Sequence, residues 1–327
     1  MATFRFHGNR WQARVRRKGH ADQTKSFLTR QDAERWARST EVELDRGIFV
    51  DTRKAQATMF GELIERYIQE VLPFKRGAKE DGIRLKALLR NGICRHAMSM
   101  LTPSKIATYR DERLRQVSAG TVIRELAYFS SVINHARREW GINIPNPVQL
   151  VKKPASPPGR DRLLSEDEEM RLLQASMPRA NRNIYTRPFI IVALETAMRR
   201  SEILGLRWQD LDFVKRTAFL RMTKNGESRT VPLSSRAIAT LDALPRLDGA
   251  KVFAVNFPAL ENNFKRARMR AGLDDLRIHD LRHTAATRLA EKLSNVLELS
   301  AVTGHKQLNM LRRYYHPKAE IIALKLL

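Results

Sequence analysis

The sequence predicts a multidomain, mainly α-helical protein with α+β parts, and three observations support this prediction. The chain has 327 residues, more than the roughly 250–300 residues at which a single hydrophobic core stops growing. Apolar residues recur at helical spacing through the middle of the chain, whereas period-two alternation and a hairpin signal occur nearer its ends. We therefore expect a small β-sheet-plus-helix domain over 1–56, a helical domain over 57–150, a linker over 151–162 and a mixed α/β domain over 163–327.

The segment 1–56 has the pattern of a short sheet followed by one helix. RWQARVRRKG (10–19) alternates apolar and polar residues as a half-buried strand does, and TKSFLT (24–29) gives a second strand after a turn. Thr29 is placed to cap the following helix, and Gly47 to end it. The basic strand surface suits a DNA groove, but a merely solvated face fits these residues equally well.

The segment 57–150 predicts helices throughout. MFGELIERYIQEVL (59–72) has apolar residues at helical spacing and stops before a proline, and TVIRELAYFSSVINHARREWG (121–141) gives the clearest helix. Arginines of this second helix that lie off its apolar face are most simply explained as solvent-exposed residues of a helix that packs in the core. Beyond it, NPVQLVKKPASPPGRDR (146–162) is rich in proline and basic residues, which predicts an extended, semi-rigid tether. Two basic domains joined in this way could close around a duplex. Ser165 is then placed to cap a helix with acidic residues in its first turn.

The charge of the chain indicates its partner. Sixty Lys and Arg against 35 Asp and Glu give a formal net charge of +25. Because the basic residues are spread along the whole chain, we expect double-stranded DNA and not a membrane surface. Cys94 is the single cysteine, which excludes an intrachain disulfide and a cysteine metal site. The N-terminus lacks a signal-peptide core and no apolar run approaches the roughly 20 residues that span a bilayer, so we expect the bacterial cytoplasm and association with the nucleoid.

Two stretches at the start of the last segment hold candidate site residues. In ALETAMRRSEILGLRWQDLD (193–212), Arg199 stands at a break between two helices, with Ser201 placed to cap the second. Glu202 can brace the arginine through a charge-assisted hydrogen bond, although a purely structural pair explains the same residues. In TAFLRMTKNGESRTVPL (217–233), a hairpin signal sets Lys224 at the tip of a mobile arm, where a lysine is usually only solvated.

A third stretch, RIHDLRHTAATRLAEKL (277–293), puts His279 and Arg282 three residues apart, on one face at the start of a helix. The small residues that follow them allow close packing against this helix. Structural roles remain open for both side chains.

The fourth stretch, VTGHKQLNMLRRYYHP (302–317), turns at Gly304-His305 and has Asn309 placed to cap a short helix. Tyr314 and Tyr315 follow one turn later. Either hydroxyl could be a nucleophile, or aromatic packing at an amphipathic helix end could explain the pair.

Together the four stretches supply the residue types that cleave a phosphodiester without a metal or another cofactor. Attack on a DNA phosphate passes through a pentacoordinate state that carries more negative charge than the ground state. Arginines can hold its oxygens with forked donors. A tyrosine becomes covalently bound, and an acid protonates the departing 5′ oxygen.

On these residues the chain resembles the tyrosine recombinases, the phage integrase family. TAMRRSEILGLRW is similar to the family's first arginine box, TKNGESRTVPL to its hairpin, HDLRHTAAT to its second box and TGHKQLNMLRRYYH to its terminal box. The family's nucleophile follows the histidine of the terminal box by nine residues, which selects Tyr314 over Tyr315. The resemblance implies six catalytic residues and one supporting residue: Arg199, Lys224, His279, Arg282, His305 and Tyr314, with Glu202 as the support.

The resemblance also implies a mechanism. Tyr314 attacks a DNA phosphate, forms a 3′-phosphotyrosyl bond and frees a 5′ hydroxyl, which attacks the phosphotyrosine of a partner duplex. Arg199 and Arg282 hold the nonbridging oxygens, and His305 is a further donor. Lys224 is the general acid, and His279 assists proton transfer or positioning. One ester replaces another, so neither ATP nor a metal is required.

At the level of domains, the resemblance implies an arm-type DNA-binding domain over 1–56, a core-binding, SAM-like domain over 57–150 and a catalytic domain over 163–327. Strand exchange through a Holliday junction implies a homotetramer on two duplexes, to which accessory DNA-bending proteins can be added. The catalytic part looks close to shufflon-type DNA invertases, whereas 1–56 is similar to the arm-binding domains of phage and island integrases. The apolar tail 318–327 is a candidate for packing on a neighbouring protomer or on its own core. Ala197 departs from the family pattern, which usually has glycine there.

Two other functions stay open at this point. A type IB topoisomerase shares the tyrosine chemistry but relaxes supercoils without strand exchange, and the Pro-rich tether and basic N-terminal unit argue against it. A DNA-binding architectural protein would carry a vestigial site, whereas all the catalytic positions are filled. The sequence does not distinguish integration, excision and inversion.

Overall fold

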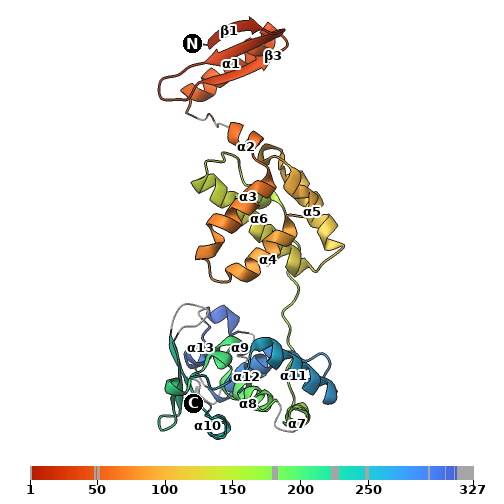
Figure 1. Ribbon diagram of the computed structural model, residues 1–327, viewed down its shortest axis with the longest axis vertical. Helices are drawn as coiled ribbons and strands as arrows, with labels where there is room; N and C mark the ends of the chain where they lie inside the picture. The colour runs from red at the N-terminus through yellow and green to blue at the C-terminus, as the bar shows by residue number, and fades with distance from the viewer. Residues whose placement is uncertain are drawn as a thin grey trace, which may run out of the picture. The chain divides into compact units, whose positions relative to one another are not determined.

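The chain divides into two units, Met1–Pro158 and Gly159–Leu327, and the division falls within the segment expected to be a linker. The computed structural model describes residues 2–47, 49, 52–178, 183–221, 228–246, 250–293, 295–305, 307–312 and 314. Helices dominate and two small antiparallel sheets accompany them (Figure 1), which confirms the mainly α prediction with α+β parts. None of the helices within these ranges has the length and apolar character needed to cross a membrane.

The N-terminal part of the first unit is a three-stranded antiparallel sheet with one helix packed on it. Trp11, Ala13 and Val15 point toward that helix, and the residues between them are exposed, so the predicted strand is confirmed. Thr29 caps the helix by accepting a hydrogen bond from the backbone N–H of Asp32. The first strand was not predicted. The elements are β1 (Ala2–His7), β2 (Arg10–Val15), β3 (Gln23–Phe27) and α1 (Arg30–Asp45).

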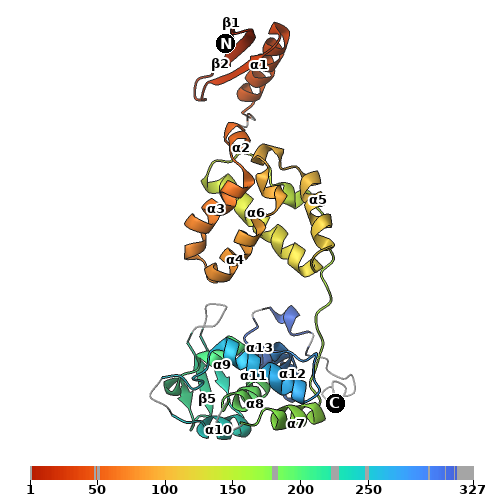
Figure 2. The same cartoon turned by 45° about the vertical axis from the view of Figure 1, so that its right-hand side comes forward.

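The rest of the first unit is helical (Figure 2). It has a hydrophobic core of its own. The longest helix, α6, buries one face that includes Val122, Phe129 and Ile133, and Phe129 meets Phe60 edge to face with ring centroids 5.0 Å apart. The elements are α2 (Arg53–Ala57), α3 (Phe60–Glu70), η1 (Leu72–Phe74), α4 (Ala78–Leu88), η2 (Gly92–Arg95), η3 (Met98–Met100), α5 (Pro103–Leu114), α6 (Ala119–Glu139) and η4 (Pro147–Leu150).

Both ends of the proline-rich segment differ from the extended tether that was predicted over 146–162. Its start forms the 3₁₀ turn η4, and Val148 is buried in the helical core because apolar side chains lie between the prolines. Its end lies on the second unit, where Arg160 donates to both carboxylate oxygens of Asp280, at 3.0 and 3.1 Å. The tether prediction is therefore wrong at these two ends.

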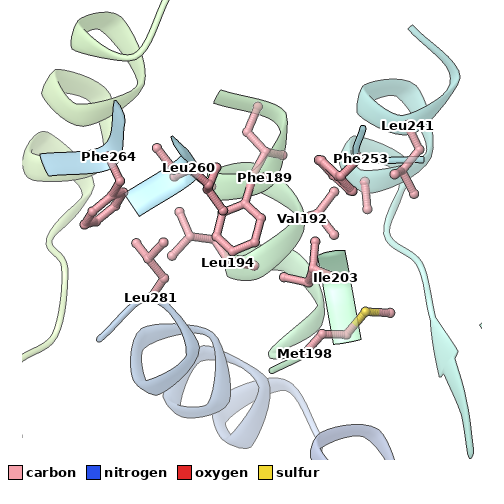
Figure 3. Close-up of a cluster of buried hydrophobic side chains, with 14 of the residues drawn as sticks. Phe189, Val192, Leu194, Met198, Ile203, Leu241, Phe253, Leu260, Phe264 and Leu281 are labelled. Atoms are coloured by element: carbon pink, nitrogen blue, oxygen red, sulfur yellow. The ribbon is translucent and has the colours of Figure 1, made fainter. Parts of the chain in front are cut away.

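The second unit surrounds helix α8, which is buried on nearly all sides. Figure 3 shows Phe189, Val192 and Leu194 of α8 among side chains from α10, α11 and α12. A three-stranded sheet, in the order β4-β5-β6, packs beside these helices. The elements are α7 (Glu166–Ala175), α8 (Thr186–Thr196), α9 (Arg200–Gly205), η5 (Trp208–Asp210), β4 (Leu211–Asp212), β5 (Thr217–Leu220), β6 (Arg229–Pro232), α10 (Ser235–Asp242), α11 (Phe257–Arg270), α12 (Ile278–Lys292), α13 (Val296–Thr303) and η6 (Leu308–Met310).

Local predictions in the second unit had mixed outcomes. β5 and β6 pair antiparallel up to Leu220 and Arg229, which confirms the strands of the hairpin. Lys224, which was predicted at its tip, lies outside the described residues. Ser165 caps α7 as predicted, accepting from the N–H of Glu168. The predicted N-cap roles of Ser201 and Asn309 are wrong. Ser201 lies inside helix α9 and Asn309 inside the 3₁₀ helix η6, whereas an N-cap residue precedes its helix. The tail 318–327 and Tyr315 are also outside the described residues.

Candidate active site

Arg199 occupies the break between α8 and α9. α8 ends at Thr196, and Arg199 takes the extended conformation that starts α9, where its N–H donates to Glu202 Oε2 at 2.8 Å. This hydrogen bond satisfies one of the free N–H groups of the helix start, which explains why Ser201 is not needed as a cap. The guanidinium donates to Glu202 Oε1 at 2.9 Å and to the carbonyl of Gly304 at 3.0 Å. The pairing of Arg199 with Glu202 matches the contact that the sequence predicted.

Glu202 is held by a second arginine, Arg229 of β6, which the sequence reasoning did not select. Arg229 donates to both carboxylate oxygens, at 2.9 and 2.8 Å, and its Nε donates to the carbonyl of Val302 at 3.3 Å. The side chains of Arg229 and Glu202 are only 12% and 4% exposed. Burial acts to raise the pKa of Glu202, but the hydrogen bonds from Arg229 and Arg199 lower it further than burial raises it. Glu202 therefore stays ionised and fixes the two guanidinium groups.

Arg282, on the first turns of α12, lies deeper than the other arginines. Its guanidinium donates to the carbonyl of Ala197 at 2.5 Å and to that of Thr303 at 2.7 Å. Burial and the nearby charge of Arg199 lower the pKa of Arg282 to about 10, so it stays protonated at neutral pH. Ala197 has φ +50°, in the left-handed region, which costs a residue with a Cβ about 1–2 kcal/mol. This conformation explains why a glycine suits the position, and it turns the Ala197 carbonyl toward Arg282.

His305 lies against Arg282, just after Gly304 ends α13. Its Nε2 is 3.3 Å from Arg282 Nη2, and its Nδ1 is 2.8 Å from the hydroxyl of Thr303. Burial, together with the charges of Arg282 and Arg199, lowers the pKa of His305 to about 4. Burial and the neighbouring arginines thus keep the ring neutral in the free protein.

Tyr314 is buried with its hydroxyl against His283 of α12. The ring is 7% exposed and packs against Ala285 and Ala286, the small residues that the sequence marked as permitting close approach. Its Oη is 2.5 Å from Nδ1 of His283, whose ring meets that of His279 edge to face at 4.7 Å. His283 was not among the predicted residues. Its position four residues after His279 places both histidines on one face of the helix, and this spacing could have identified it. Burial and the charge of Arg282 lower the pKa of His279.

The chain therefore brings together five of the six predicted catalytic residues, as well as Glu202. Arg199 and Arg229 pair with the one carboxylate of Glu202. Burial and the surrounding arginines lower the pKa values of Arg282, His279 and His305, so positive charge exceeds negative charge in the cluster. An entering phosphate would supply that charge, next to a tyrosine hydroxyl. Fold and site together define the class of enzyme that transfers DNA strands through a tyrosine.

Comparison with known proteins identifies the family. The model of the phage integrase family matches residues 162–320. A Haemophilus influenzae protein described as an integrase/recombinase is 35% identical over 327 residues, covering 97% of this chain and 87% of the relative. The shufflon-specific DNA recombinase of Escherichia coli is 40% identical over 272 residues, covering 80% of this chain and 70% of the relative. A lambda integrase tetramer bound to a Holliday junction has the same fold, with a TM-score of 0.66 at 20% identity over 94% of this chain and 93% of that chain.

The chain therefore belongs to the phage integrase family, the tyrosine recombinases. It is a site-specific recombinase that cleaves and rejoins DNA. The type IB topoisomerase and the non-catalytic architectural protein are not favoured.

Proposed function

We propose that Tyr314 is the nucleophile of this recombinase, and that Arg199, Arg282 and His305 hold the attacked phosphate. The observation that carries the proposal is the convergence of Tyr314 with Arg199, Arg282 and His305, which come from different elements of the chain, in one buried, positively charged cluster. Arg199 and Arg282 are anchored through backbone carbonyls and Glu202, so their remaining N–H groups are oriented before DNA binds. Lys224, which lies between β5 and β6 in the sequence, is the proposed general acid toward the 5′ oxygen.

The reaction proposed for this site needs neither a metal nor ATP. Attack by Tyr314 exchanges the 5′ oxygen of the DNA for the phenolic oxygen, so the energy of the ester is kept for rejoining. The positive charge that a metal would bring is supplied by arginines that stay protonated. Cleavage should therefore continue in the presence of EDTA and without nucleotide.

A nicked DNA substrate that loses its 5′ product after cleavage tests the proposal, because it traps the covalent complex for detection on a denaturing gel. We expect a covalent band with the unaltered protein, in EDTA and without ATP, and none with Tyr314→Phe. Tyr315→Phe, which removes the adjacent hydroxyl, should still form the band and serves as the matched control. Covalent complex from Tyr314→Phe, or its loss only in Tyr315→Phe, would contradict the assignment.

We also propose that the first unit binds DNA in two ways. Segment 1–56 would bind arm-type sites through the face of the sheet that α1 leaves open, where Arg5, Arg10 and Gln12 are exposed on adjoining strands. Segment 57–150 would bind the core site beside the cleaved phosphate, and 151–162 would link it to the catalytic domain. Two duplexes would be held by a tetramer, with accessory DNA-bending proteins where the sites are far apart.

Inversion of a DNA segment is the outcome that the similarity to the shufflon-specific recombinase favours, and integration or excision is the alternative. Sequencing the junctions formed in cells distinguishes them. Inversion keeps both junctions on one molecule in reversed orientation, whereas integration joins two molecules.

A further inference from the structure

We propose that His283 is the base that accepts the proton of the Tyr314 hydroxyl during cleavage. The inference rests on the proposed role of Tyr314 as nucleophile. It assigns proton transfer to a different histidine from His279, which the family resemblance had suggested. The observation that carries it is the 2.5 Å contact between Tyr314 Oη and His283 Nδ1.

The elements around this contact hold both groups in place. His283 lies on the second turn of α12, directly after Arg282, and it is only 8% exposed. Tyr314 is held by the small residues of α12, and the two rings are tilted by 34° with centroids 5.6 Å apart. His279, one turn earlier, meets the His283 ring edge to face and so supports the ring that contacts the tyrosine.

The chemistry of the contact suits a proton transfer. A tyrosine hydroxyl has a pKa of about 10 in water, so at neutral pH it is a weak nucleophile unless a base removes its proton. A neutral imidazole has one nitrogen with a free lone pair, and Nδ1 of His283 lies within hydrogen-bond reach of that proton. His283 touches a reacting atom and is therefore a catalytic residue in this scheme.

The step balances in both directions. In cleavage the bond between Tyr314 Oη and phosphorus forms, the bond between phosphorus and the 5′ oxygen breaks, and the Oη proton moves to His283 Nδ1. The departing 5′ oxygen takes a different proton, from the general acid proposed at Lys224. In rejoining, the 5′ hydroxyl gives its proton back to Lys224 and its oxygen forms a bond to phosphorus, the bond from phosphorus to Oη breaks, and His283 returns its proton to the phenolate.

The pH dependence of this step involves several charged or titratable neighbours. His279 and Arg282 lie beside His283 on α12. His305 faces the Tyr314 ring after α13, with ring centroids 6.0 Å apart, and its pKa responds to the charge of His283 and of Arg199. A base at His283 should give a cleavage rate that rises with pH through one ionisation and then levels off. That ionisation should be absent when residue 283 cannot accept a proton.

The test uses His283→Asn in the full chain, because an asparagine oxygen can accept the hydrogen bond near the Nδ1 position but cannot take the proton. Single-turnover cleavage should slow by about 100-fold, the lower range for loss of a general base, and the rising limb of the pH profile should vanish. A substrate with sulfur in place of the bridging 5′ oxygen has a leaving group that needs no acid. It should restore cleavage by Lys224→Ala but leave the His283→Asn defect unchanged.

Each other outcome overturns the inference. Unchanged or faster cleavage by His283→Asn would mean that the contact only holds Tyr314 in place in the free protein and takes no part in proton transfer. Rescue of His283→Asn by the sulfur substrate would make His283 part of the acid step, and a retained rising limb would place the base elsewhere. His283→Gln is a second variant that also removes the base. Thermal unfolding and DNA binding, measured for both variants, show whether slow cleavage comes from misfolding or from loss of the base. Tyr314→Phe run in parallel distinguishes the two proposals, because covalent complex from that variant would refute the nucleophile itself.

Discussion

The hydrogen bonds around His305 determine which of its ring nitrogens carries the proton. Arg282 can only donate, so Nε2 of His305 must accept in their 3.3 Å contact. Nδ1 then carries the hydrogen and donates to Thr303 Oγ1, which in turn donates to the carbonyl of Leu299 at 2.6 Å. This tautomer follows from the network and agrees with a ring whose pKa is lowered to about 4. For His305 to donate from Nε2 to a phosphate as proposed while Nδ1 still donates to Thr303, the ring must take up a proton when DNA binds.

The first prediction concerns the stability of the free protein in mild acid. The pKa of His305 falls from 6.5 to about 4 on folding, so between these values the unfolded chain binds more protons than the folded one. The contribution of His305 to stability is therefore complete above pH 6.5 and is lost as the pH falls toward 4; His279 shifts in the same direction. Thermal unfolding should show that Tm falls more steeply across this range in the unaltered protein than in His305→Gln.

DNA should reverse this effect, because a phosphate beside His305 favours the protonated ring. Calorimetric titration at pH 5.5 in buffers of different ionisation enthalpy should show net proton uptake on DNA binding, reduced in His305→Gln. Equal uptake by both proteins would contradict a neutral His305 in the free site.

At the scale of elements, the end of α13 is packed against the arginine that holds Glu202. Gly304 ends the helix at φ +69°, and a Cβ built there would lie 2.7 Å from Arg229 Nη1. We expect Gly304→Ala to lose about 1–2 kcal/mol from the backbone conformation alone. The displaced Arg229 should also loosen Glu202 and Arg199, so cleavage should fall by more than DNA binding does. Chemical unfolding and single-turnover cleavage measure the two effects.

Gly205→Ala is the matched control for that substitution. Gly205 is the last residue of α9, has no positive φ, and no heavy atom lies within 4 Å of a Cβ built there. Its replacement should leave stability and cleavage close to those of the unaltered protein. If Gly304→Ala behaved in the same way, Arg229 would not be needed to order the site.

Elements that depend on nearby residues could be predicted from the sequence. The strand over Arg10–Val15 follows from alternation, and the caps at Thr29 and Ser165 follow from side chains that reach the N–H groups three residues on. The prediction at Ser201 failed for a related reason, since α9 begins one residue before Ser201 and Glu202 accepts the hydrogen bond from the backbone N–H of Arg199 at its start. The prediction at 146–162 failed because composition does not reveal that Val148 fits a core formed by distant helices.

The site could be predicted only where its residues fall in ordered motifs. Arg199, Arg282, His305 and Tyr314 were selected from such motifs, and the fold brings them together. Arg229 and His283 were not selected, because their partners are 27 and 31 residues away in the chain. A basic residue in a strand and a second histidine in a helix look ordinary until their partners are known.

At the scale of the whole molecule, the charge of +25 is carried by every part of the chain. In the N-terminal sheet, Arg5 and His7 of β1 lie opposite Gln12 and Arg10 of β2. These side chains are exposed on the face away from α1, since Ala13 and Val15 point toward the helix. Polar and basic side chains on an open sheet face can contact both base edges and phosphates, which is the basis for proposing an arm-site role for 1–56.

The last prediction tests that role with the paired substitutions Arg5→Gln and Arg10→Gln. If these side chains bind phosphates of an arm site, affinity for that site should fall, and the log–log salt slope should decrease by about 0.9 for each phosphate that is no longer neutralised. Cleavage of an isolated core site should be unchanged, because the residues proposed for cleavage belong to the second unit. Arg35→Gln with Arg38→Gln removes the same charge from exposed positions on α1 and is the control. An equal loss of affinity in both pairs would mean that net charge alone, and not the sheet face, binds the arm DNA.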